Sequence, residues 1–169
     1  MYKYLLYFLI FSFLGWFVEV TFQLFKGGGL VNRGLAKGPV CPIYGIGICL
    51  CAALLGGIES FLALALLSMA IATAVELAVG YFSDRVLSVR LWDYTSEKGN
   101  ILGYVCPRFS LIWGLLCASV IRLLPLVDRV VDMLGGAVFK GAAFLVFVLV
   151  LADERMVMEK SIKGKQKAK

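Results

Sequence analysis

The chain has 169 residues, of which 61% are hydrophobic and only 17% are charged. A mean hydropathy of +0.90 is too high for a water-soluble globule and predicts an integral membrane protein. The formal net charge is +6, and the basic residues gather in a few short segments, so we interpret them as topology signals and contacts with anionic lipid, not as a nucleic-acid surface.

Five apolar runs predict five transmembrane helices, at about residues 5–25, 40–57, 61–82, 109–126 and 137–152. At ~1.5 Å per residue, most of these runs match a hydrocarbon core of ~30 Å. The last run is short, but it spans if Lys140 snorkels to one interface while Asp153 and Glu154 mark the other. We therefore expect one all-α transmembrane domain over residues 1–152 and a basic cytoplasmic tail over residues 153–169.

The positive charges predict the orientation of the helices. The Lys and Arg residues gather in the loops 26–39 and 83–108 and in the tail, with these exceptions: Lys3, Arg122, Arg129 and Lys140. Because cytoplasmic loops of membrane proteins carry the excess of Lys and Arg, we expect the N-terminus outside and the C-terminus in the cytoplasm. The chain is then a multi-pass protein of the cytoplasmic membrane.

A short internal repeat relates the first two helices to the third and fourth. Val18-Glu19 matches Val75-Glu76, and the loop ending Gly38-Pro39-Val40-Cys41-Pro42 matches the one ending Gly103-Tyr104-Val105-Cys106-Pro107. Both hairpins enter the membrane in the same direction. The pattern therefore predicts two parallel helical-hairpin repeats, related by an axis along the bilayer normal, with the fifth helix outside them.

Each repeat carries one glutamate inside an otherwise apolar helix. Glu19 shares a helical stripe of small and polar residues with Gly15, and Glu76 shares a similar stripe with Gly80. A carboxylate at membrane depth is costly and usually faces a polar interior. We hypothesise that Glu19 and Glu76 are proton or cation sites in a solvated cavity. The alternative is that each only accepts hydrogen bonds from a neighbouring helix.

The two cytoplasmic loops contain the densest polar chemistry. Helices that begin at Pro42 and Pro107 would aim free N–H groups at a cytoplasmic vestibule, and such groups attract anions or carboxylates. We expect the following residues to bind the substrate or to shape a gate there: Asn32, Arg33, Asp93, Asn100 and Arg108. In the alternative interpretation, the arginines only obey the positive-inside rule, and Trp92 and Tyr94 lie at the headgroup level.

Two of the five cysteines, Cys41 and Cys106, precede a helix start, where a thiolate is favoured. They are candidates for reactive or ligating thiols, with structural packing as the alternative. The chain has no histidine, so it lacks the commonest imidazole ligand and the usual general base. We predict no metal site and no cofactor. It also has no Walker A loop, so we expect no ATP hydrolysis by this chain through that motif.

Several motifs occur together between about residues 8 and 115: Ser12-Phe13-Leu14-Gly15-Trp16 with Glu19, Asn32-Arg33-Gly34, Gly38-Pro39 through Gly45, Glu76, Trp92-Asp93-Tyr94, Asn100, Gly103, Cys106 and Trp113-Gly114. In these motifs the chain resembles the small bacterial membrane proteins of the putative ABC-transporter type IV family, also called CmpB-like permeases, to which a vertebrate transmembrane-protein family is similar. The chain departs from the family pattern at Asp84, Leu91 and Thr95, where the family tends to have Glu, Trp and Ser. The resemblance implies a permease-like function.

These patterns predict a permease that moves a small solute or ion. A homodimer is expected because five short helices make a thin wall for a pathway, and a separate ATPase or transporter subunit is a candidate partner. A membrane-embedded enzyme remains open, with Glu19, Glu76 or Asp93 as acid or base and Cys41 or Cys106 as nucleophile. A non-catalytic partner subunit is the third alternative.

Overall fold

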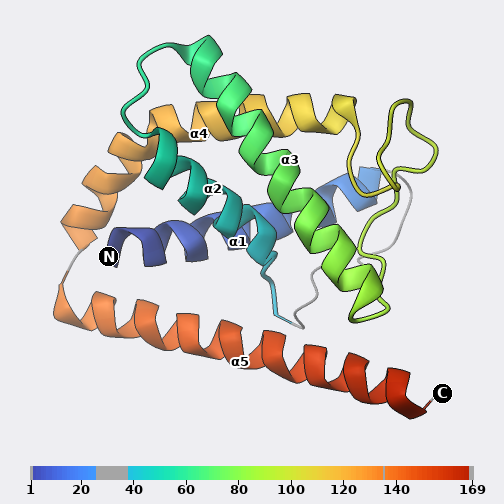
Figure 1. The fold of residues 1–169 in the computed structure, drawn as a ribbon. Coiled ribbons are helices and arrows are strands. Elements are labelled where there is room, and N and C mark those ends of the chain that lie inside the picture. Colours follow the sequence, from blue (N-terminus) through green and yellow to red (C-terminus); the bar gives the residue numbers. More distant parts are fainter. Residues whose placement is uncertain (1, 26–37, 135, 168–169) are drawn as a thin grey trace.

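The structure is a computed structural model, and it describes residues 2–25, 38–134 and 136–167. Asn32 and Arg33, two of the expected loop residues, lie outside this described part. Within it, the chain forms these helices: α1 (Tyr2–Phe25), α2 (Pro42–Leu55), α3 (Phe61–Arg85), α4 (Pro107–Leu134) and α5 (Ala137–Lys167). The expected all-α class is therefore confirmed (Figure 1).

Two helices continue well beyond the apolar runs that predicted them. α4 runs through Pro125 to Leu134, and α5 runs past the expected end at residue 152 to Lys167. The second half of α5 is charged, but its Lys, Glu, Arg and Met residues are good helix formers. Arg155 and Glu159 add an ion pair of 2.9 Å at the i,i+4 spacing that supports an exposed helix.

Three of the described helices, α1, α3 and α4, are long and apolar enough to cross a membrane. Large apolar side chains stand on their outer surfaces, for example Phe17 at 58% and Leu62 at 69% exposure, where lipid would cover them. The chain is therefore a multi-pass membrane protein. α2 has 14 residues and so a length of about 21 Å, which is shorter than a hydrocarbon core of ~30 Å.

Close helix contacts are made where small residues leave room. A Cβ atom added to Gly45 of α2 would collide with Ser12 Oγ of α1, and one added to Gly114 of α4 would lie 2.6 Å from Met69 Cβ of α3. α1 therefore packs tightly on α2, and α3 on α4, which is the usual way that membrane helices approach without a hydrophobic driving force. The centre of the bundle is filled by the fully buried Cys51 of α2 and neighbours from α1, α3 and α4.

α5 forms an outer layer along α1, as the long orange and red helix in Figure 1 shows. Phe147 of α5 meets Phe8 of α1 edge-to-face with 5.5 Å between the ring centroids. Six residues further along α5, Asp153 Oδ2 accepts a hydrogen bond of 2.9 Å from the backbone N–H of Gly38. α5 is thus fastened at two levels to the hairpin that α1 and α2 form.

Candidate functional site: two intramembrane glutamates and the aromatic groups between them

Glu19 lies on α1 and pairs with a tyrosine of α2. The Tyr44 hydroxyl donates a 2.7 Å hydrogen bond to Glu19 Oε1. Gly15, one turn earlier on α1, makes this possible, because any Cβ there would collide with the Tyr44 ring. The stripe that holds Gly15 and Glu19 is therefore the surface of α1 over which Tyr44 lies.

Glu76 lies on α3 and is only 5% exposed. Its Oε1 atom accepts two hydrogen bonds, one of 2.9 Å from the Tyr94 hydroxyl and one of 3.2 Å from Trp113 Nε1 of α4. Its other oxygen, Oε2, is buried and has no hydrogen-bond partner among the residues that the structure describes. One oxygen of the carboxyl group thus accepts two hydrogen bonds, while the described part of the chain supplies none to the other.

An aromatic contact connects the two glutamates. The Tyr44 ring meets the Trp113 ring edge-to-face with 5.3 Å between their centroids. Tyr44 donates to Glu19 and Trp113 donates to Glu76, so the order of direct contacts is Glu19, Tyr44, Trp113 and Glu76. Residues from α1, α2, α3 and α4 therefore meet in one polar cluster inside the bundle.

The loop 86–106, which joins α3 to α4, brings Tyr94 to Glu76. The Tyr94 ring stacks on Phe109 in the first turn of α4, with 4.6 Å between centroids and 11° between planes. Burial, and after it the Glu76 carboxyl, raise the pKa of the Tyr94 phenol above its ordinary value. The hydroxyl therefore remains a hydrogen-bond donor throughout the physiological pH range.

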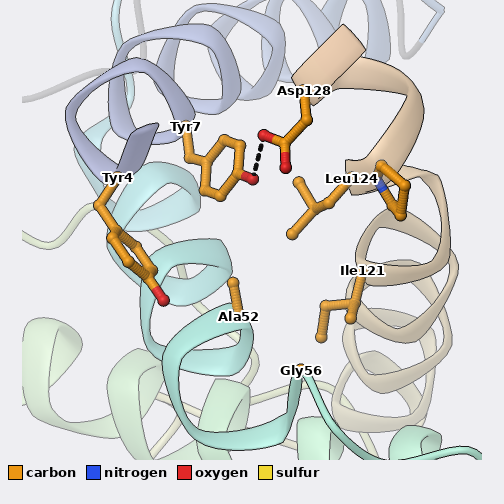
Figure 2. A pocket seen from close by; sticks show the side chains of 8 residues that line it. Tyr4, Tyr7, Ala52, Gly56, Ile121, Leu124 and Asp128 are labelled. Atoms are coloured by element: carbon orange, nitrogen blue, oxygen red, sulfur yellow. Dashed lines mark hydrogen bonds between the residues drawn. The ribbon is translucent and has the colours of Figure 1, made fainter. Parts of the chain in front are cut away.

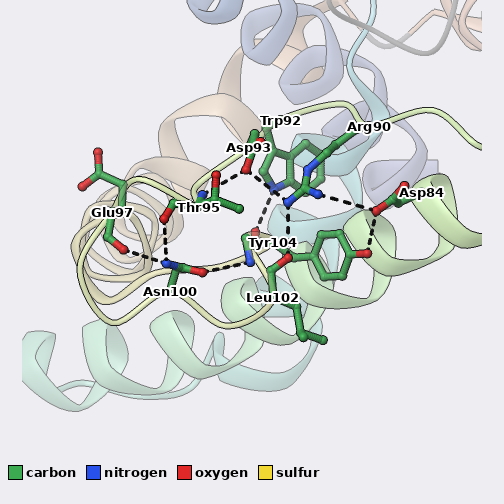
Figure 3. A network of polar contacts seen from close by, with 10 residues as sticks. Asp84, Arg90, Trp92, Asp93, Thr95, Glu97, Asn100, Leu102 and Tyr104 are labelled. Atoms are coloured by element: carbon green, nitrogen blue, oxygen red, sulfur yellow. Dashed lines mark hydrogen bonds and ion pairs between the residues drawn. The ribbon is translucent and has the colours of Figure 1, made fainter.

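A network of polar contacts holds this loop in shape (Figure 3). Asp93 Oδ1 accepts a 2.9 Å bond from the backbone N–H of Thr95 and a 3.1 Å bond from Arg90. Asn100 Nδ2 donates to the Glu97 carbonyl at 2.8 Å, and Asn100 Oδ1 accepts from the N–H of Gly103 at 3.0 Å. These side chains point at the backbone of their own loop and close it on itself.

The loop also packs on α3. Trp92 Nε1 donates a 2.7 Å bond to the Tyr104 carbonyl, and the Tyr104 hydroxyl donates a 2.7 Å bond to Asp84 near the end of α3. Gly80, one turn after Glu76, gives the space, since a Cβ there would lie 3.2 Å from both Trp92 and Tyr104. Asp84 therefore holds the loop against α3 directly.

The surroundings of Arg108, Cys41 and Cys106 give little support for a binding or catalytic role. Arg108 is 70% exposed at its side chain and pairs with Glu97 at 3.6 Å. Cys106 is 1% exposed, and burial raises the pKa of the Cys41 thiol to about 12. A buried thiol and a thiol that stays protonated are poor nucleophiles, which disfavours the enzymatic alternative for these two residues.

The sequence did not mark Tyr44 and Trp113 as partners of the glutamates. Both stand in the motifs that carry the family resemblance, but nothing in the spacing along the chain says which carboxylate an aromatic donor will reach. One of the two interpretations placed Tyr94 at the headgroup level; in the structure its hydroxyl donates a hydrogen bond to Glu76 Oε1. For Glu19 the useful signal was Gly15, one turn away, because it leaves room for the Tyr44 ring; Gly80 makes room for Trp92 and Tyr104, which do not bond Glu76.

Comparison with known proteins gives one clear relationship. The family described as "Putative ABC-transporter type IV" matches residues 6–158, which is most of the chain. The chain belongs to this family. No curated protein and no solved structure matches.

Proposed function

We propose that this member of the putative ABC-transporter type IV family is a permease that moves protons or a small monovalent cation through its helix bundle. Glu76 is the principal binding site in this proposal, and Glu19 is the second. The observation that carries it is the environment of Glu76: a buried carboxyl group with two donors on one oxygen and none, among the described residues, on the other.

The chemistry of Glu76 supports a positively charged substrate. An ionised carboxylate in a medium of low dielectric constant is unfavourable unless its charge is compensated. Tyr94 and Trp113 supply hydrogen bonds to Oε1 but no net charge, and among the described residues nothing donates to Oε2. Binding one positive charge would neutralise the group, and releasing it would restore the charged state.

The chain of direct contacts from Glu19 through Tyr44 and Trp113 to Glu76 supports a transport path with two binding sites. Both carboxyl groups are held by tyrosine hydroxyls, Tyr44 and Tyr94 respectively, and Trp113 lies between the two pairs. A proton or ion released by one carboxyl group would be near the other. In the alternative, purely structural role, the same bonds would only fix the helices.

The membrane arrangement remains part of the proposal. We expect α2 and α5 to cross the bilayer with the three long helices, with the N-terminus outside and the loop 86–106 in the cytoplasm of a cytoplasmic-membrane protein. We also propose that the two helical hairpins form an internal repeat, that the chain forms a homodimer, and that another chain supplies an ATPase. Single cysteines at Lys3 and Ala168, in a cysteine-free background, should label from outside and inside respectively. Labelling of both from one side would contradict the arrangement.

Transport is tested by reconstituting the full-length chain in liposomes that enclose a pH-sensitive dye. A potassium gradient with valinomycin sets an inside-negative potential, and proton entry is recorded; parallel samples measure uptake of labelled sodium. We expect flux above that of empty liposomes without nucleotide. Glu76→Gln and Glu19→Gln should abolish it, because each keeps the size of the side chain and removes its charge.

Glu59→Gln is the matched control, since Glu59 is exposed in the connection between α2 and α3. It should transport like the parent protein. If both intramembrane Gln variants transport normally and keep the parental melting profile, the carboxyl groups only hold the helices together. If flux is seen only when an ATPase is added, the proposed binding site stands, but the energy source is ATP hydrolysis by that partner.

A further inference from the structure

A cavity of about 200 Å³ lies between α1, α2 and α4, at the end of the bundle away from the loop 86–106. Figure 2 shows Tyr7 and Asp128 along one edge of it, Tyr4 on one side and Leu124 on the other, with Ala52 below. None of these residues belongs to the cluster around Glu19 and Glu76. The cavity is therefore a separate feature on the opposite side of the membrane domain.

Among the residues that line this cavity, Asp128 is the one that carries a charge. The Tyr7 hydroxyl donates a 2.6 Å hydrogen bond to Asp128 Oδ1, while Lys3 Nζ lies 3.1 Å from Asp128 Oδ2. Lys3 is also 3.8 Å from Asp132 Oδ2, so one lysine is shared by two carboxylates. Each carboxylate oxygen has more than one lone pair, and the Asp128 side chain is still 28% exposed. It can accept a further donor.

A proline removes one backbone hydrogen bond from the helix that forms part of the same wall. Pro125 lies inside α4 and has no N–H, so the carbonyl of Ile121, four residues earlier, loses its partner within the helix. Ile121 and Pro125 both line the cavity. Broken backbone pairing in a membrane helix is tolerated where it lines such a space, and the freed carbonyl is a typical ligand of cations.

We propose that this cavity binds a primary ammonium group, either on a free small amine or on a lipid headgroup. The rings of Tyr4 and Tyr7, which meet edge-to-face at 5.8 Å, offer aromatic surface to a cation. Asp128 supplies the charge, and the Ile121 carbonyl accepts an N–H. The apolar side chains of Ala52 and Leu124 suit the carbon atoms that an amine carries. The Asp128 carboxylate in the lining disfavours an anion.

The test is thermal unfolding of the full-length protein in dodecyl maltoside, with ethylammonium chloride compared against sodium chloride at equal ionic strength. We expect ethylammonium to raise the melting temperature of the parent protein. Asp128→Asn should weaken the apparent affinity about ten-fold or more, because the compensating charge is gone. Ala52→Leu should abolish the effect, because the larger side chain fills the cavity while Asp128 stays in place. This variant still tests the proposal if Asp128→Asn folds poorly.

Asp132→Asn is the matched control, since Asp132 pairs with Lys3 but does not line the cavity. It should respond like the parent. Native mass spectrometry with phosphatidylethanolamine and phosphatidylglycerol distinguishes the source: selective retention of phosphatidylethanolamine, lost in Asp128→Asn, identifies a lipid headgroup. A response to ethylammonium without such retention identifies a free amine. The proposal is overturned if neither amine is bound, or if Asp128→Asn and Ala52→Leu respond like the parent.

Discussion

Replacing Glu76 with Ala and with Gln separates its structural role from its charge. Glu76→Ala removes the acceptor of two donors, the Tyr94 hydroxyl and Trp113 Nε1. An unpaired buried donor costs roughly 1–3 kcal/mol, and hydrogen bonds between membrane helices average about 0.6 kcal/mol with a maximum near 1.7. Because both donors are only half-buried, we assign about 1–2 kcal/mol to each. Glu76→Ala should therefore lower the free energy of unfolding by about 2–4 kcal/mol.

Glu76→Gln should behave differently. Its carbonyl oxygen can still accept from both donors, and its amide replaces the oxygen that has no described partner, so we expect a change within about 1 kcal/mol. The free energy of unfolding is measured by equilibrium titration with dodecyl sulfate in mixed micelles, followed by circular dichroism. Glu59→Ala is the control for loss of a glutamate and should be near neutral. Equal destabilisation by Ala and Gln, or no effect of Ala, would refute the reasoning.

Three further outcomes follow from the loop and the thiols. Gly103→Ala should destabilise the protein by about 1–2 kcal/mol in the same titration, because Gly103 has φ of +72° and no room for a side chain. The bond from the Thr95 N–H lowers the pKa of Asp93, so its contribution is present above the unfolded value of about 3.9 and is lost as the pH falls through the folded pKa. Protease sensitivity of the loop should rise over that acid range, and Asp93→Asn should remove the dependence. Cys41 should react with maleimide at neutral pH far more slowly than an introduced Ser96→Cys thiol, since burial raises its pKa to about 12; equal rates would contradict this.

The helices and the two carboxylates could be predicted from the sequence because both depend on local pattern. Apolar runs mark α1, α3 and α4 well, and the helical spacing places Glu76 and Gly80 on one stripe. The ends of α4 and α5 could not be read from hydropathy, since a helix that leaves the apolar region continues as long as its residues favour it.

The partners of the glutamates depend on tertiary contacts that local pattern does not contain. Tyr44 reaches Glu19 across a helix interface, whereas Tyr94 reaches Glu76 from a loop. From the sequence alone, Tyr94, which follows Asp93 in a loop, is interpreted equally well as an aromatic residue at the membrane interface. Likewise, Asp93 and Asn100 read as gate residues because they are polar and lie in a loop, but their hydrogen bonds go to that loop's own backbone and to Arg90.

This difference gives the polar residues of the loop a role that fits the site. Each of the two glutamates accepts a hydrogen bond from a tyrosine hydroxyl, but the two tyrosines are held in place in different ways. In the first, Tyr44 is carried by α2 and needs only the space at Gly15. In the second, Tyr94 sits on an irregular segment, and an irregular segment can hold a hydroxyl in place only if its own backbone groups are satisfied. Asn100 satisfies the Glu97 carbonyl and the Gly103 N–H, and the Gly103 carbonyl in turn accepts a 2.9 Å bond from the N–H of Tyr94, so these contacts hold the segment that carries the Tyr94 hydroxyl.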